Sequence, residues 1–203
     1  MLKASLIALL LAAAPLQLPT LQVTNMPDVM QMNDYSCGVA CFQAVAQRHG
    51  HWGYQADWAK ELGTTPEQGT HPLKITRALK HLGLDAHLRE QLSYDELRSM
   101  IDRGDSVIVD FQAWADPSKR RPAHDYAKEW ESGHYAIAVG YDADHIYLED
   151  PSLLGTVGML SHADFQARWH DYELESGKRR EYVRMAIVVA GQGVPAQPFT
   201  PIE

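Results

Sequence analysis

The 203-residue sequence is short of positive charge, of cysteine and of long apolar runs. It has 18 Lys and Arg against 26 Asp and Glu, which gives a net charge of −8. Phosphate binding needs clustered basic residues, and the two short basic clusters, at 119–121 and 178–180, are typical of solvated loops. The composition therefore argues against a nucleic-acid partner. A hydrophobic content of 45% with 22% charged residues is that of a globular protein rather than a disordered one.

No apolar stretch is long enough to span a membrane comfortably, which takes about 20 residues. The run from Ala4 to Leu16 follows a lysine at position 3 and has the pattern of a secretory signal. Pro15 obstructs cleavage directly after the small residues at 12–14, and no cysteine follows that could carry a lipid. Residues 1–20 are therefore predicted to be a signal peptide or an N-terminal anchor. We expect an exported protein, periplasmic or secreted, which an uncleaved segment would hold at the membrane.

The length allows one domain with a proper core, and no internal repeat or low-complexity tract divides it. Helices are expected first and a mostly antiparallel sheet after them, which is an α+β arrangement. The domain is predicted over residues 21–190, with a loose tail over 191–203. The predicted helices cover 37–49, 54–62, 71–82, 93–103 (opened by a capping box of Ser93 and Glu96) and 161–170, and the predicted strands cover 84–88, 106–111, 134–141, 145–150 and 182–190.

The two cysteines, Cys37 and Cys41, lie four residues apart at the start of the first predicted helix. In an exported protein, the plain expectation for two cysteines is a disulfide. Regular helix geometry, however, directs both side chains along one face without the Cβ approach that a disulfide prefers. We therefore interpret Cys37 as reactive and Cys41 as a buried packing residue, with the disulfide as the alternative.

The segment from Gln31 to Cys41 is the most informative part of the sequence. It places Cys37 at the first turn of a helix, where unpaired N–H groups and the helix dipole favour the thiolate. Gln31, six residues upstream, offers a side-chain N–H donor that could point at the same reacting atom. A thiolate and an amide donor form half of a covalent acyl-transfer site, which still needs a base.

Ten histidines compete for the role of base, and His134 is distinguished by its expected neighbour. With a hairpin loop centred on Ala143, Tyr141 opposes His145, and counting outward makes Asp150 a diagonal neighbour of His134 on one face. A carboxylate beside an imidazole fixes its tautomer and stabilises the imidazolium. A register shift of one residue would put the carboxylate on the opposite face. The alternative is a strand-end histidine beside an Asp-Pro turn.

A long segment without clear periodicity, 112–133, leads into this histidine. Connections of that length inside a domain are usually functional loops or disordered segments. This one carries Trp114, Tyr126 and Trp130, which favours a packed loop. We expect it to line a substrate groove, with a peripheral core as the alternative.

Three blocks of the sequence resemble cysteine peptidase family C39, the bacteriocin-processing peptidases that cut double-glycine leaders. Residues 31–41 resemble the nucleophile motif, residues 130–142 the histidine region and residues 150–152 the aspartate region. Residues 165–171 resemble the stand-alone members that lack a transporter. Together these blocks are spread over most of residues 26–190.

The resemblance implies a papain-like α+β fold with Cys37 as nucleophile, His134 as base, Asp150 as its orienting residue and Gln31 as oxyanion donor. No cofactor is expected. The best-known members are fused to membrane-spanning and ATP-hydrolysing domains. This sequence has neither, and it contains no Gly-x-x-x-x-Gly-Lys-Ser/Thr phosphate loop. The resemblance therefore implies neither double-glycine specificity nor ATP coupling here.

We predict a cysteine peptidase that acts on a peptide or protein amide bond. An acyltransferase on the same site is one alternative, with an amine in place of water as acceptor. A metal-binding module that uses Cys37, Cys41, His49 and His51 is another, although this spacing departs from common zinc patterns. An inactive, peptide-binding relative is a third, against which the complete set of four site residues argues.

Overall fold

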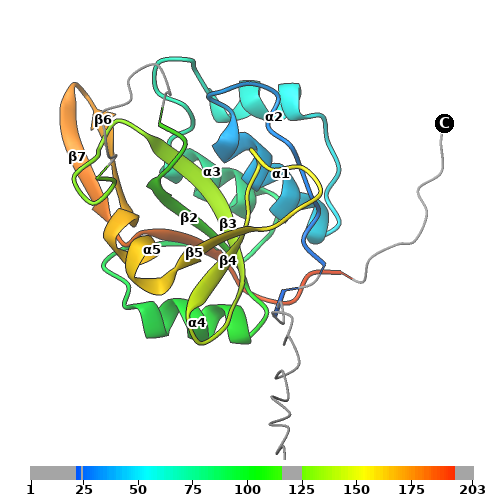
Figure 1. The fold of residues 1–203 in the computed structure, drawn as a ribbon. Coiled ribbons are helices and arrows are strands. Elements are labelled where there is room, and N and C mark those ends of the chain that lie inside the picture. The colour runs from blue at the N-terminus through cyan, green and yellow to red at the C-terminus, as the bar shows by residue number, and fades with distance from the viewer. Residues whose placement is uncertain (1–21, 24, 116–124, 195–203) are drawn as a thin grey trace, which may run out of the picture.

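The computed structural model describes residues 22–23, 25–115 and 125–194 as mixed helix and antiparallel sheet (Figure 1). The helices are α1 (Cys37–Arg48), α2 (Gln55–Leu62), α3 (Pro72–His81), α4 (Tyr94–Asp102) and α5 (His162–Arg168). The strands are β1 (Ala86–Arg89), β2 (Ser106–Gln112), β3 (Gly133–Tyr141), β4 (His145–Glu149), β5 (Gly158–Ser161), β6 (His170–Glu175), β7 (Lys178–Val183) and β8 (Ala186–Val189). The predicted α+β class is confirmed.

Six of the strands form one antiparallel sheet in the order β1-β8-β2-β3-β4-β5, and β6 and β7 form a separate two-stranded sheet. The central strand β2 is buried along its whole length, and its apolar side chains alternate between the two faces of the sheet. Helices α1 and α3 lie behind the large sheet in Figure 1, and α4 and α5 lie on its other side. The sheet is therefore the middle layer of three.

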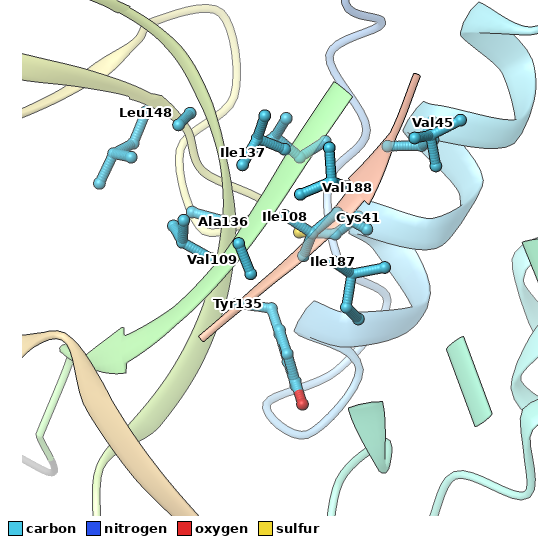
Figure 2. Packing of buried hydrophobic residues seen from close by; sticks show 14 of the residues in the cluster. Cys41, Val45, Ile108, Val109, Tyr135, Ala136, Ile137, Leu148, Ile187 and Val188 are labelled. Atoms are coloured by element: carbon cyan, nitrogen blue, oxygen red, sulfur yellow. The ribbon is translucent and has the colours of Figure 1, made fainter. Parts of the chain in front are cut away.

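Helix α1 is apolar on most of its surface and packs against β3. Cys41 and Val45 of this helix pack on the side of the sheet that carries Ile108, Ile137 and Ile187, which are cross-strand neighbours on β2, β3 and β8 (Figure 2). Burial of these side chains removes apolar surface from water, at about 1.5–3 kcal/mol for each large residue. This packing fixes α1, and with it the residue at its first turn, against the middle of the sheet.

The helix starts agree with their sequence signals. Ser93 and Glu96 form the predicted capping box at the start of α4, with both reciprocal hydrogen bonds present. Ser161 caps α5 by accepting a hydrogen bond from the Asp164 N–H at 3.1 Å. Helix α3 begins with Pro72 at its first position, where a missing N–H costs nothing.

The predicted register of the β3–β4 hairpin is wrong at its turn. Tyr141 pairs with Ile146, not with His145, because the Asp142 carboxylate accepts hydrogen bonds from two backbone N–H groups of the turn and tightens it. A β-bulge then skips Val139, whose carbonyl accepts a hydrogen bond from the Val23 N–H instead.

Beyond this bulge the pairing returns to the register expected from the sequence. Ala138 pairs with Leu148 and Ile137 with Glu149. The bulge therefore cancels the register error at the turn. In the half of the hairpin that carries His134, side chains lie on the expected faces of the sheet.

The C-terminal part of the chain differs most from expectation. The predicted strand over 182–190 is broken at Arg184, which has a φ of 50° and donates its N–H to the Trp169 carbonyl. The first part belongs to β7 and the second to β8, in different sheets. Strand β5 is only four residues long and β6 has a mostly polar sequence, and neither was predicted.

Residues 191–194, the first part of the predicted loose tail, are held by hydrogen bonds to the buried Arg48 and its surroundings. The Arg48 guanidinium donates to Ser106 Oγ at 2.6 Å, to the Gly104 carbonyl at 2.8 Å and to the Gln192 carbonyl at 2.9 Å. Its Nε donates to Asn25 Oδ1 at 3.0 Å. Arg48 thus joins three distant segments of the chain. The predicted segments 1–20 and 195–203 lie outside the described residues.

Replacing Arg48 with methionine should destabilise the domain without disturbing the start of α1. Removal of the guanidinium leaves buried oxygen acceptors without donors, so we expect a loss of about 3 kcal/mol in unfolding free energy. Urea unfolding measures this loss. Cys37 lies about 16 Å away along the helix, and its rate of alkylation in native buffer should be unchanged. A native-like stability of Arg48→Met would show that these hydrogen bonds are not important to the fold.

Candidate active site

Cys37 is the first residue of α1, and the N-terminus of this helix is left uncapped. Ser36, which precedes it, is fully buried and makes no side-chain capping bond. Its hydroxyl is used by the preceding turn, where it bonds both the N–H and the carbonyl of Asn33 at 3.2 Å. The first turn of α1 also contains no acidic side chain. Its free N–H groups and the helix dipole are therefore available to an anion, such as the Cys37 thiolate.

His134 lies near the start of β3 and is bonded to Asp150, which follows β4. The two atoms, His134 Nε2 and Asp150 Oδ1, are 2.7 Å apart, and both side chains are buried. Phe111, directly opposite on β2, packs against the imidazole ring in an edge-on contact. Since Nε2 is engaged by the carboxylate, Nδ1 is the nitrogen left for the thiol, with which His134 also has a hydrogen-bonding interaction.

The charges of these three groups support one another. Burial favours the neutral thiol of Cys37, yet the hydrogen bond and positive charge of His134 outweigh it and lower the thiol pKa. Burial likewise opposes the imidazolium, but hydrogen bonds to Asp150 and Cys37 raise the pKa of His134 to about 9. The carboxyl pKa of Asp150 is lowered, although burial opposes this, because His134 binds the ionised form. These shifts all favour a thiolate–imidazolium pair beside a carboxylate.

Two further residues hold the Asp150 carboxylate, and sequence reasoning did not assign either of them this place. The indole Nε1 of Trp114 donates to Oδ2 at 2.9 Å, and the Ser152 N–H donates to Oδ1 at 2.8 Å. Trp114 has a φ of 53°, and its side chain is exposed. Of the loop predicted to line a substrate groove, residues 116–124 lie outside the described part of the chain.

Gln31 is tied to the turn that follows β4. Its backbone N–H donates to the Pro151 carbonyl at 2.9 Å, and its side-chain Oε1 accepts from Ser152 Oγ at 3.2 Å. The side-chain Nε2 donates to the Asn33 carbonyl at 2.7 Å, which uses one of its two N–H groups. The second N–H remains for another acceptor. Ser152 thus links the amide of Gln31 to the carboxylate of Asp150.

The alternatives based on the other cysteine and histidines receive no support. Cys37 and Cys41 are both free, and burial raises the pKa of Cys41 well above its usual range. His49 contacts Ser106 Oγ at 3.2 Å. Within residues 22–23, 25–115 and 125–194, no three His, Cys, Asp or Glu side chains lie close enough together to hold a metal ion.

The lowered thiol pKa predicts a distinct pH dependence of alkylation. The rate of Cys37 with iodoacetamide should rise with pH through a midpoint below the ordinary cysteine value of about 8.5. His134→Ala removes the imidazolium and should raise that midpoint by about one pH unit or more. Peptide mapping after timed labelling gives both rates, and Cys41 should stay unlabelled until the protein unfolds. An equal midpoint in both proteins would show that His134 does not stabilise the thiolate.

Solved structures with this arrangement of elements include three peptidase domains. A C39-like peptidase from Bacillus anthracis has 18% identity and a TM-score of 0.60, with 84% of this chain and 96% of that chain covered. The peptidase domain of Streptococcus ComA, a bifunctional ABC transporter involved in quorum sensing, has 23% identity and a TM-score of 0.57, with 81% and 97% covered.

The third is a double-glycine-motif protease from an AMS/PCAT transporter in complex with the leader peptide. It has 16% identity and a TM-score of 0.55, with 86% of this chain and 100% of that chain covered. These similarities show the fold, which is the papain-like one predicted from the sequence. No curated protein sequence matches the chain.

The model of the Peptidase C39 family matches residues 25–181. This range includes every element that carries the candidate site, from the segment before α1 to the turn after β4, and it extends through β6 into β7. Since the match covers more than half of the sequence, the chain belongs to the Peptidase C39 family and is a cysteine peptidase.

Proposed function

We propose that the protein is an exported peptidase that hydrolyses a peptide or protein amide bond with Cys37 as nucleophile and His134 as base. Asp150 orients the imidazole, and Gln31 contributes to the oxyanion site. The observation that carries the proposal is the hydrogen-bonded series from Asp150 through His134 to Cys37 at the uncapped start of α1. Nucleophile, base and orienting acid in that order are the arrangement that amide cleavage by a thiol requires.

The reaction follows from the protonation states. The Cys37 thiolate attacks the carbonyl carbon, a C–S bond forms, and the carbonyl electron pair moves onto oxygen. The free N–H of the Gln31 amide and the backbone N–H of Cys37 stabilise this oxyanion. The His134 imidazolium gives its proton to the amine nitrogen, and the C–N bond breaks. Water, deprotonated by His134, then attacks the thioester and restores the thiolate as the acid is released.

The substrate is proposed to be a peptide. Two of the similar structures are a peptidase domain and a protease from transporters, and the second is in complex with a leader peptide. Double-glycine specificity is not part of the proposal. An acyltransferase would use the same thioester and an amine acceptor, so the product of the second step separates the two activities.

Export is proposed from the N-terminal sequence, in which Lys3 precedes the apolar run from Ala4 to Leu16. Among the described residues, no helix is long and apolar enough to cross a membrane. We expect the protein made in a bacterial host to be recovered outside the cytoplasm, with residues 1–20 either cleaved or retained as a membrane anchor. Cell fractionation and N-terminal sequencing test this, with a protein lacking residues 1–20 as control. Recovery of both forms in the cytoplasm would contradict export.

Substitutions at the site should separate the proposed roles. His134→Ala should lower kcat/KM for a cleaved peptide by about 10³-fold or more, because both proton transfers lose their carrier. Asp150→Asn should cost less, about 10- to 100-fold, since asparagine can still accept a hydrogen bond from the ring. Peptide-library cleavage followed by mass spectrometry gives the scissile bond and the rates.

His145→Ala is the matched control, because His145 lies at the far end of the same hairpin and contacts Asp142. Its kcat/KM should equal that of the unsubstituted protein. Loss of activity in His145→Ala with activity retained in His134→Ala would reassign the base. Transfer to an added amine, with no hydrolysis, would identify an acyltransferase.

A further inference from the structure

Trp114 combines two features that are unfavourable in an ordinary surface residue. It lies just after β2 with a φ of 53°, a backbone conformation that is rare and costly for a bulky side chain. It is also 57% exposed, so burial of its ring does not explain this conformation. Residues with strained backbones persist where their surroundings hold them, and they are frequent at active sites. The contacts of Trp114 therefore bear on its role.

The backbone on both sides of Trp114 is tied to the chain that leads into β3. The N–H of Ala113 donates to the Ser132 carbonyl at 2.9 Å, which continues the pairing of β2 with β3 beyond the end of both strands. The N–H of Ala115 donates to the Tyr126 hydroxyl at 3.4 Å. Trp114 lies between these two attachments, so its position is defined although its side chain is largely in solvent.

The polar atom of this side chain binds the carboxylate of Asp150. The indole Nε1 donates to Oδ2 at 2.9 Å, whereas His134 and the Ser152 N–H both bind Oδ1, at 2.7 and 2.8 Å. In the described part of the chain, Trp114 is the one donor to Oδ2. The last torsion of an aspartate side chain is soft, and donors on one oxygen alone do not fix it. A donor on each oxygen fixes the plane of the group.

His134 depends on this plane, because it sets the direction in which Oδ1 accepts the hydrogen bond of the ring, and such bonds weaken steeply away from linearity. Burial opposes the imidazolium, but the hydrogen bonds to Asp150 and Cys37 overcome it and raise the pKa of His134 to about 9. A carboxylate that turned away would weaken one of these two supports. The Cys37 thiolate would then lose part of the positive charge beside it.

We propose that Trp114 is a positioning residue of the peptidase reaction, whose indole N–H holds the Asp150 carboxylate in the orientation that binds His134. It acts on the nucleophile through two intermediate groups. The strained backbone is the means by which a residue at the end of β2 brings a donor to an acid that follows β4. The inference rests on the proposed peptidase function and adds a residue to its machinery.

Trp114→Phe tests the role, because it keeps an aromatic ring and removes the N–H. We expect kcat for a cleaved peptide to fall by about tenfold and KM to stay within about twofold, since the hydrogen bond supports the base and not substrate binding. Trp52→Phe is the control. Trp52 is a 69% exposed tryptophan between α1 and α2, and its substitution should leave both constants unchanged. A raised KM with unchanged kcat would make Trp114 a substrate-contacting residue and overturn the positioning role.

A second measurement does not depend on peptide turnover. The pH midpoint of Cys37 alkylation by iodoacetamide should rise by about half a pH unit in Trp114→Phe, because a less ordered carboxylate supports the imidazolium less well. If the indole only withdrew charge from Asp150, its removal would strengthen the acid–imidazolium pair and lower the midpoint. The sign of the shift therefore separates positioning from a purely electronic effect.

Other ionisable groups also act on this site. Asp110 on β2 and Cys41 on α1 influence the thiol, and Glu149 on β4 interacts with Asp150. All three stay unchanged in Trp114→Phe, so they do not account for a difference between the proteins. In an Asp150→Ala protein, the further change Trp114→Phe should leave the midpoint where it is, because the group through which the indole acts has been removed.

The outcomes separate the two proposals. An unchanged or lowered midpoint in folded Trp114→Phe would overturn the positioning role and leave the peptidase function intact. So would an equal shift in the presence and absence of the Asp150 carboxylate. A raised midpoint in a protein whose unsubstituted form cleaves no peptide would support the positioning of a reactive thiol and overturn the proposed hydrolysis.

Discussion

The close approach of α1 to β3 is the constraint on which the site depends. At Gly38 an added Cβ would lie 2.9 Å from Thr70 Cβ, 3.0 Å from Tyr135 Cδ2 and 3.2 Å from Ile75 Cδ1, so only glycine fits without displacement of its neighbours. Because this residue follows Cys37, its lack of a side chain brings the helix N-terminus onto the strand that carries His134. The free N–H groups of the helix and the imidazole then act on one sulfur atom. A larger residue would separate these two sources of positive potential.

Hydrogen bonds join the proposed nucleophile, base and oxyanion donor into one series. Gln31 is linked through Ser152 to Asp150, and Asp150 is linked to His134. A change at the Asp150 carboxylate therefore affects both the orientation of the base and the position of the amide donor. Trp114 donates to the other oxygen of this carboxylate, so protein donors engage both of its oxygens. Preorganisation of this kind reduces the rearrangement needed as charge develops in the reaction.

Much of this arrangement could be predicted from local sequence. The helix start at Cys37 and the pairing of His134 with Asp150 follow from short-range patterns, and the structure brings Gln31 to the same region. The hairpin turn was predicted one residue out of register. The bulge at Val139 compensates for this error, and the alternation of side chains in the sequence does not indicate a bulge there. The packing of Asp171 against Gly133 could not be predicted, because it requires β6 to fold against β2 and β3 from a distant part of the chain. Long-range contacts of that kind leave no periodic trace in the sequence.

The hydrogen bonds around Arg48 have a consequence for how the domain is attached to other chain segments. Asn25 near one end of the described domain donates to the carbonyls of Gln192 and Val194 near the other end. Both ends therefore leave the domain at one place, at the opposite end of α1 from Cys37. Any segment joined at either end would be attached at the end of α1 that is opposite to Cys37, and therefore away from the candidate active site. The same proximity makes this junction a natural site for circular permutation, in which the old ends are joined and the helix with its nucleophile is left uninterrupted.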